Sequence, residues 1–271
     1  MNKFTTLTLF ITGFILNQQI YANSKEQLFY DAVRFESTGQ ISVAISLYEQ
    51  IAKEASSSNL HGNLANLYFK SEDYGRSILN YRKALNLDND NRDFHYNLVY
   101  VKKVAGLPPM PEFEFGYLGG TTNNFWKVFL AIVFWAGFLL VSIFFYKRYS
   151  NNLIYFIFAC WTVLNLIIAV FVYHSGKQKQ TAELEVIALK PNLTEDTNGS
   201  INVQLRKFAA ENSTSNTEVK PGESLLVLES SRGGINSHNS QDLQKWLLVS
   251  SPNNRKKGWV PEREIGWIVY K

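Results

Sequence analysis

Cysteine is almost missing from this sequence, because Cys160 is the one cysteine among 271 residues and it lies inside an apolar run. A single cysteine excludes an intramolecular disulfide and suggests no cysteine-based metal site. The four histidines, His61, His95, His174 and His238, are scattered along the chain. Their spacing suits neither a zinc site nor a catalytic pair with Cys160.

Motifs of common enzyme classes are missing as well. The sequence contains no P-loop, GxSxG or HExxH segment. We therefore predict that the chain is not an enzyme and that it needs no cofactor and no metal. Acidic and basic residues are about equally frequent over residues 24–104, whereas a nucleic-acid surface needs clustered Lys and Arg. We therefore predict no nucleic-acid partner.

A regular helical spacing is present in residues 63–91, "NLANLYFKSEDYGRSILNYRKALNLDNDN". Small and aromatic residues recur every three or four positions on both sides of a break at residues 71–73. This pattern predicts two amphipathic helices packed as a hairpin, with Asp73 as the N-cap of the second. The positions expected to be buried by this packing are Leu64, Ala65, Tyr68, Ser77, Tyr81 and Ala84.

The same order of residues occurs upstream in "AVRFESTGQISVAISLYEQIAKE" and restarts downstream in "DFHYNLVYVKKVAG". The period is close to about 34 residues, and the segment resembles the tetratricopeptide repeat (TPR) family. The resemblance implies an all-α region of two helical hairpins and a closing helix over residues 24–104. His61 and His95 lie one period apart, and we interpret them as helix-packing residues.

The face of each first helix that is not used in packing is the expected partner-binding surface. By helical spacing it carries Phe29, Val33, Glu36, Asn66, Phe69, Lys70, Tyr96, Tyr100 and Lys103. Aromatic residues commonly anchor interfaces, Asn66 can pair with a peptide backbone, and Lys70 and Lys103 could hold a carboxylate. The alternative is a solvated surface with no partner, because two repeats make a short groove.

The N-terminal segment "MNKFTTLTLFITGFILNQQIYANS" combines Lys3 with an apolar run over residues 4–16. Ile20 and Ala22 occupy the positions that precede a signal-peptidase cut. We predict a signal peptide over residues 1–22, cleaved after Ala22. The alternative is an uncleaved membrane anchor, although the run is shorter than the roughly 20 residues of a spanning helix.

Two longer apolar runs, residues 125–146 and 153–173, are predicted transmembrane helices. The connection at residues 147–152 is short, so an antiparallel hairpin is expected. Lysines near both ends leave the orientation open, and the signal peptide places the loop in the cytoplasm and both soluble parts on the exported side. Asn165 is expected to bond to the other helix or to another copy. A transport role is the alternative, and the lack of charged residues deep in either span weighs against it.

Residues 105–124 are rich in Pro and Gly and predict a linker. After Gly176, short apolar runs between turn residues predict four or five strands and a small all-β barrel over residues 182–268. "VKPGESLLVLE", "KWLLVS" and "KKGWVPE" resemble a bacterial SH3 domain. We expect Trp246, Val260 and Leu226 in its core and Trp259 partly exposed beside a ligand groove.

The order of these modules along the whole chain resembles the BatE-like proteins of the Bacteroides aerotolerance (Bat) group. The resemblance implies a multidomain protein of the bacterial inner (cytoplasmic) membrane, with its soluble domains periplasmic, that acts as a scaffold linked to aerotolerance or stress. Implied partners are membrane proteins with von Willebrand factor A domains and a MoxR-type AAA+ ATPase.

Two functions stay open at this point. One is an adaptor that binds a partner protein through its repeats, and the other is an envelope receptor whose SH3-like domain binds cell-wall peptide.

Overall fold

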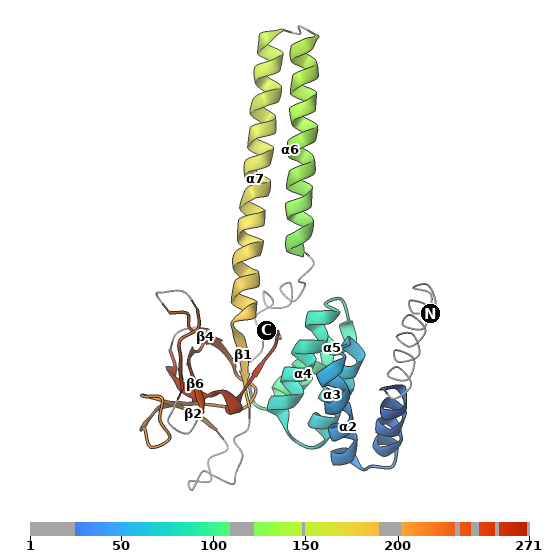
Figure 1. The fold of residues 1–271 in the computed structure, drawn as a ribbon, viewed down its shortest axis with the longest axis vertical. Helices are drawn as coiled ribbons and strands as arrows, with labels where there is room; N and C mark the ends of the chain where they lie inside the picture. The colour runs from blue at the N-terminus through green and yellow to red at the C-terminus, as the bar shows by residue number, and fades with distance from the viewer. Residues whose placement is uncertain are drawn as a thin grey trace, which may run out of the picture. The chain divides into compact units, whose positions relative to one another are not determined.

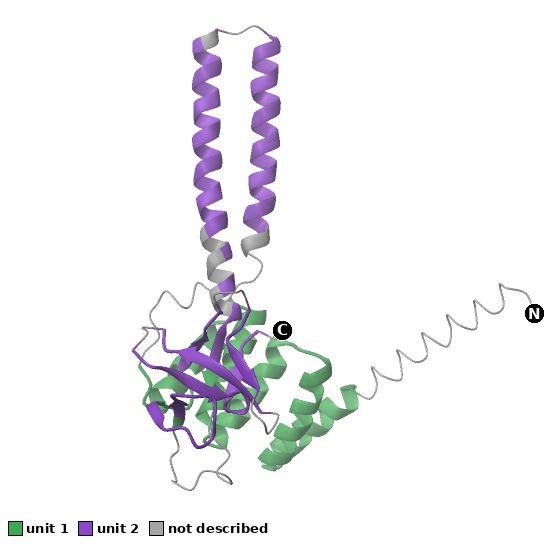
Figure 2. Cartoon of the chain, turned by 60° about the vertical axis from the view of Figure 1, so that its left-hand side comes forward, with its two compact units in different colours: residues 1–109, 187–203, 218–223 green, residues 110–186, 204–217, 224–271 purple. Residues whose placement is uncertain are grey.

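The computed structural model describes residues 25–108, 122–147, 150–189, 202–230, 234–239, 244–252 and 255–269. The chain divides into two compact units (Figure 2). The first comprises residues 1–109, 187–203 and 218–223, and the second comprises residues 110–186, 204–217 and 224–271. The predicted signal peptide and residues 109–121 of the predicted linker lie outside the described residues.

The first unit is mainly helical, with a helix at residues 25–37 followed by α2 (Ile41–Glu54), α3 (Ser58–Lys70), α4 (Tyr74–Leu87) and α5 (Arg92–Val104) (Figure 1). Polar side chains begin the last three helices: Ser57, Asp73 and Asn91 accept hydrogen bonds from the amides of Leu60, Arg76 and Phe94 at 3.1–3.2 Å. Such caps satisfy amides that have no partner inside the helix. The prediction of two hairpins, a closing helix and an Asp73 cap is confirmed.

The helices pack through the residues that the spacing indicated. All six positions predicted to be buried have no more than 6% of their surface exposed: Leu64, Ala65, Tyr68, Ser77, Tyr81 and Ala84. A continuous core joins the first three helices, formed by Ala32, Ala44, Tyr48, Ile51, Leu60, Leu64, Leu67 and Tyr68. Small residues at facing positions therefore allow close approach, and tyrosines fill the space beside them.

The second unit contains two long helices, α6 (Thr122–Tyr146) and α7 (Asn151–Glu183), which lie side by side along their length (Figure 1). Each has a segment of 22 residues that is long and apolar enough to cross a membrane, Phe125–Tyr146 and Asn152–Tyr173. The apolar segment of α6 is 0% buried and that of α7 is 6% buried, so neither segment lies in a protein core. The helix α7 continues past the predicted span end at residue 173, because Lys, Gln, Ala and Glu residues that follow favour helix.

The C-terminal part forms an antiparallel sheet of eight strands. They are β1 (Glu185–Ala188), β2 (Val203–Arg206), β3 (Ser215–Val219), β4 (Ser224–Val227), β5 (Ser237–Asn239), β6 (Lys245–Ser250), β7 (Lys257–Pro261) and β8 (Ile265–Trp267). The 3₁₀ helix η2 (Glu262–Glu264) precedes β8. The order is β3-β2-β7-β6-β4-β1-β8, and β5 pairs with β6.

The expected number of four or five strands was too low. One of the additional strands is β5, whose Ser237, His238 and Asn239 pair with β6. A three-residue strand surrounded by turn residues is too short to show a period of two. The strand β8 is equally short and follows η2 directly.

The core of the sheet agrees with the sequence at two positions and differs at a third. Trp246 and Val260 are fully buried, as predicted. Leu226 is only half-buried, whereas its neighbours Leu225 and Val227 are buried. Successive side chains of a strand point to opposite faces, so the assignment of Leu226 to the core was wrong by one residue.

Candidate protein-binding surface

The first helix of each hairpin presents aromatic side chains on the face that is not packed in the core. Phe29 of the helix at residues 25–37 is 37% exposed, and Tyr96 and Tyr100 of α5 are 72% and 49% exposed. Lys70 and Lys103 are exposed, and Asn66 and Phe69 are half-buried. Helical spacing explains this arrangement, because the opposite face carries buried residues such as Leu64, Leu67 and Leu98.

Two of these aromatic rings connect α3 to α5. The ring centroids of Phe69 and Tyr100 are 5.7 Å apart in an edge-on arrangement, and the ring of Tyr74 lies 5.9 Å from Phe69. Such pairs add to the stabilisation that comes from burial alone. Phe69 therefore forms the floor of an aromatic cluster whose outer ring, Tyr100, still faces solvent.

Lys70 does not stand alone on this surface. Its ammonium lies 3.0 Å from the carboxylate of Glu36, which occupies a position 34 residues earlier in the chain. Both side chains are partly exposed, so the pair contributes little to stability. The Lys70 ammonium has three donors, so it could bind a partner carboxylate while it stays bonded to Glu36.

The side chain of Asn66 is held in place by a hydrogen bond from a buried residue. Its Oδ1 accepts a hydrogen bond from the hydroxyl of Tyr81, and Tyr81 is buried. Burial raises the pKa of the Tyr81 hydroxyl to about 12, so the hydroxyl stays protonated and keeps donating. This bond fixes which way the amide points, and it leaves the amide nitrogen as the group of Asn66 that could meet a peptide backbone.

Val99 is a member of this face that the sequence reasoning missed. It is 44% exposed and lies three residues after Tyr96 and four before Lys103. The sequence spacing could have predicted that Val99 lies on this face, because residues three and four apart share one side of a helix. The side chains that we assign to the first-helix surface are Phe29, Val33, Asn66, Phe69, Lys70, Tyr96, Val99, Tyr100 and Lys103.

His61 belongs to the packing and not to a reactive site. It is buried, its Nδ1 lies 3.0 Å from Asn80 Oδ1, and its Nε2 lies 2.9 Å from Ser56 Oγ. Asn80 Nδ2 donates to the carbonyl of Arg76 at 2.9 Å, which orients the amide so that Oδ1 accepts from Nδ1–H. The interpretation of His61 as a packing residue is confirmed.

Trp259 is half-buried on β7, where it stands opposite Arg206 of β2 and Leu248 of β6. The neighbouring Trp246 is fully buried, with the guanidinium of Arg206 5.5 Å from its ring. The predicted partial exposure of Trp259 is confirmed, and its role in binding stays a prediction.

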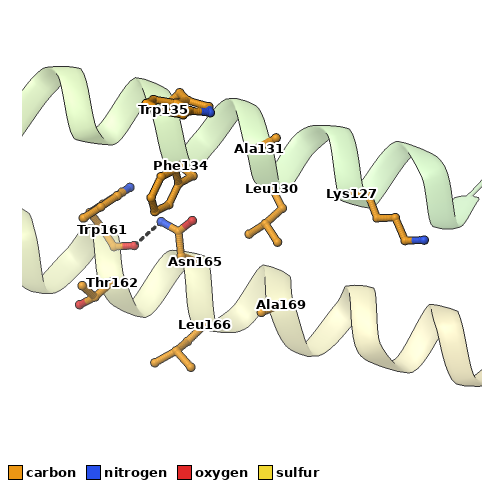
Figure 3. A pocket seen from close by; sticks show the side chains of 10 residues that line it. All are labelled: Lys127, Leu130, Ala131, Phe134, Trp135, Trp161, Thr162, Asn165, Leu166 and Ala169. Carbon is orange, nitrogen blue, oxygen red and sulfur yellow. Dashed lines mark hydrogen bonds between the residues drawn. The ribbon is translucent and has the colours of Figure 1, made fainter.

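A pocket of about 590 Å³ lies between α6 and α7 and contains Asn165 (Figure 3). The Asn165 Nδ2 donates to the carbonyl of Trp161 at 2.8 Å, one turn back on the same helix. The amide nitrogen therefore does not make the expected bond to α6, and the alternative of a bond to another copy stays a prediction. Trp161 instead makes the contact across the hairpin, with Nε1 3.4 Å from the carbonyl of Val133.

Comparison with known proteins supports the helical part of this description. A family model described as "TPR repeat" matches residues 65–102. The chain contains a tetratricopeptide repeat. The matched residues include the C-terminal part of α3 from Ala65 on, all of α4 and nearly all of α5, and thus Asn66, Phe69, Lys70, Tyr96 and Tyr100. No curated protein matches the chain. The TPR match indicates a protein–protein interaction role.

Proposed function

We propose that the chain is a non-enzymatic, membrane-anchored adaptor that binds a partner protein through the first-helix surface of its TPR. The observation that carries the proposal is the exposure of Tyr96 and Tyr100 beside the half-buried Phe69. Rigid aromatic side chains lose little conformational entropy on binding and frequently act as hot spots. Lys103 is exposed, and the Lys70 ammonium has three donors of which Glu36 uses one, so both lysines favour a partner segment that carries a carboxylate.

Membrane anchoring by α6 and α7 is part of the proposal. It is supported by their length, by their apolar composition and by the exposure of residues such as Phe138, Leu139 and Ile143. Side chains of this kind are stable in contact with hydrocarbon and unstable in water. We further propose that the TPR and the C-terminal sheet lie on the periplasmic side of a bacterial inner membrane, which the predicted signal peptide favours.

The order of modules extends the proposal to the identity of the partner. By resemblance to the Bat group, the partners are membrane proteins with von Willebrand factor A domains, in a complex that includes a MoxR-type ATPase and serves aerotolerance or stress. A second candidate function is cell-wall peptide binding by the sheet, which would be an SH3-like domain. The half-buried Trp259 favours it, since such a ring can stack on a ligand while it remains anchored in the sheet.

The test uses the full chain in native membranes with a photoreactive amino acid at Tyr96 or, as a control, at Leu87. Leu87 is 51% exposed but lies on α4, a second helix. Crosslinks to a protein carrying a von Willebrand factor A domain from position 96, and none from position 87, support the proposal. The crosslink should disappear in the double variant Lys70→Ala/Tyr100→Ala and persist in Lys53→Ala/Leu87→Ala, which removes exposed side chains of the second helices. Equal crosslinking from both positions would contradict it.

A further inference from the structure

The outer face of α4 is buried although no further hairpin of the array follows α5 within the described residues 25–108. Ile78 is 0% exposed and Leu79 is 7% exposed. Leu107, three residues beyond the end of α5, is also buried. The last hairpin of a repeat array normally needs a covering element, because each hairpin buries only one side of itself. Some other segment of the first unit must cover these apolar residues.

That segment is the turn at residues 220–223. The Glu223 amide donates to the Lys220 carbonyl at 3.0 Å, and Gly222 has a φ of +92°, which an L residue rarely adopts. Hydrogen bonds tie the turn to β1: the Gly222 amide donates to the Ala188 carbonyl at 2.8 Å, and the Ala188 amide donates to the Glu223 carbonyl at 3.0 Å. The turn is therefore a fixed structure and not a loose loop.

The turn at residues 220–223 lies so close to the helices that there is no room for a side chain at Gly222 of the turn or at Gly75 of α4. A Cβ atom at Gly222 would lie 2.5 Å from Ile78 Cδ1 and 2.9 Å from Leu107 Cδ1. A Cβ atom at Gly75 of α4 would lie 3.3 Å from Pro221 Cβ and 3.1 Å from the Ala188 carbonyl oxygen. Glycine thus stands at both points of closest approach, which is the pattern expected where two backbones must come together.

A polar contact completes the interaction. Lys220 Nζ donates to the carbonyl of Gly106 at 3.3 Å, just after the C-terminal end of α5. Cations are favourable near the C-terminal end of a helix, where carbonyl groups have no partner inside the helix. The turn therefore matches the surface in both shape and charge.

We infer that residues 220–223 form an intramolecular cap of the repeat array. The cap covers the α4 and α5 surface on which a further helix of a longer array would pack. A chain closed in this way cannot extend its array by stacking on the repeats of another molecule. The cap does not use Tyr96 or Tyr100, so it is compatible with partner binding at the first-helix surface.

A disulfide test measures the contact directly in the full chain. The variant Gly75→Cys/Pro221→Cys, in a Cys160→Ala background, places two Cβ atoms at a distance close to the roughly 3.5–4.5 Å of natural disulfides. The control is Gly39→Cys/Pro221→Cys, because a Cβ at Gly39 meets no atom within 4 Å. We expect an intramolecular disulfide in the first variant and none in the control, identified by mass spectrometry of the linked peptide. The inference would be overturned if Gly75→Cys/Pro221→Cys kept its helical structure but formed no disulfide, or formed one only between two chains. Equal disulfide formation in Gly39→Cys/Pro221→Cys would overturn it as well.

A second pair of variants separates the contact from the conformation of the turn. Gly222 and Gly234 have almost equal φ values of +92° and +91°, but a Cβ at Gly234 meets nothing within 4 Å. Valine at either position strains the backbone, and only at Gly222 does it also collide with the repeats. In Gly222→Val we expect amide hydrogen exchange of α4 and α5 to rise about tenfold, because overpacking displaces the covering segment. Gly234→Val should leave these amides unchanged, and an equal effect of both variants would contradict the cap.

Discussion

The hydroxyl of Ser77 donates a hydrogen bond to the backbone carbonyl of Ala65 at 2.8 Å, and both residues are fully buried. The bond joins α4 to α3 at a point where neither residue has a large side chain. The two backbones can approach closely for this reason, and the hydroxyl is satisfied despite its burial. Small size and hydrogen bonding are separate contributions, and they can be measured separately.

Replacing Ser77 by Ala should cost about 0.5–1.5 kcal/mol, since it removes one hydrogen bond without adding volume. Replacing it by Leu should cost more, because overpacking adds about 1–3 kcal/mol to the lost bond. Hydrogen exchange of the α3 and α4 amides reports both effects. Ser37→Leu, at an exposed position, serves as the control. If Ser77→Leu were tolerated as well as Ser77→Ala, close approach at this point would not matter.

The packing of the repeats was predictable because it depends on local spacing. Ala65 and Ser77 follow the helical period, and Asp73 has a side chain of the type that caps helices. The ion pair of Lys70 with Glu36 was not predictable, since it depends on how two long side chains orient across neighbouring repeats. Each residue was assigned to the right face, but their mutual contact was not foreseen.

In the sheet, the prediction of buried residues was limited by the lack of alternation between apolar and polar residues in β4. Leu225, Leu226 and Val227 are three apolar residues in a row, so their sequence does not show which of them point inward. Pairing of β4 with β6 decides the register, and that pairing is a long-range property. The cap at residues 220–223 was hidden for a similar reason. Pro221 and Gly222 indicated a turn, but no local pattern showed that Ile78 and Leu107 lie against it.

Trp246 should dominate the stability of the sheet. It is fully buried, and truncation of such a residue to Ala typically costs about 3–5 kcal/mol. Trp259→Ala should cost less, because that side chain is only half-buried. Hydrogen exchange of the β6 and β7 amides in the full chain compares the two variants. Similar protection in Trp246→Ala and in the parent protein would show that Trp246 is not a core residue.

The proposed topology predicts the location of three reporter fusions. Reporters placed after Val104 and after Lys271 should be active on the exported side, and one placed within residues 150–152 should report the cytoplasm. The physical reason is that the 22-residue apolar segments of α6 and α7 are each about one membrane thickness long, so the chain returns to the side from which it entered. A cytoplasmic signal from the Val104 fusion would exclude export of the TPR.

The last prediction concerns the pH dependence of the repeats. Burial lowers the pKa of His61 below its ordinary value of about 6.5, although the hydrogen bond to Asn80 opposes the shift. As the pH falls through about 6.5, the unfolded chain binds a proton at this position while the folded chain does not. Stability therefore decreases as the pH falls from about 6.5 towards the folded-state pKa, and it is fully retained above 6.5.

His61→Gln should remove part of this dependence, because glutamine does not titrate in that range and can still form hydrogen bonds with Asn80 or Ser56. The measurement is the protection of α3 and α4 amides against hydrogen exchange between pH 5 and 8, corrected for the intrinsic exchange rate at each pH. The parent protein should lose protection below about pH 6.5 and the variant should lose less. If both lost protection in parallel, the imidazole of His61 would not be the group that responds, and its burial between Asn80 and Ser56 would carry no pH effect.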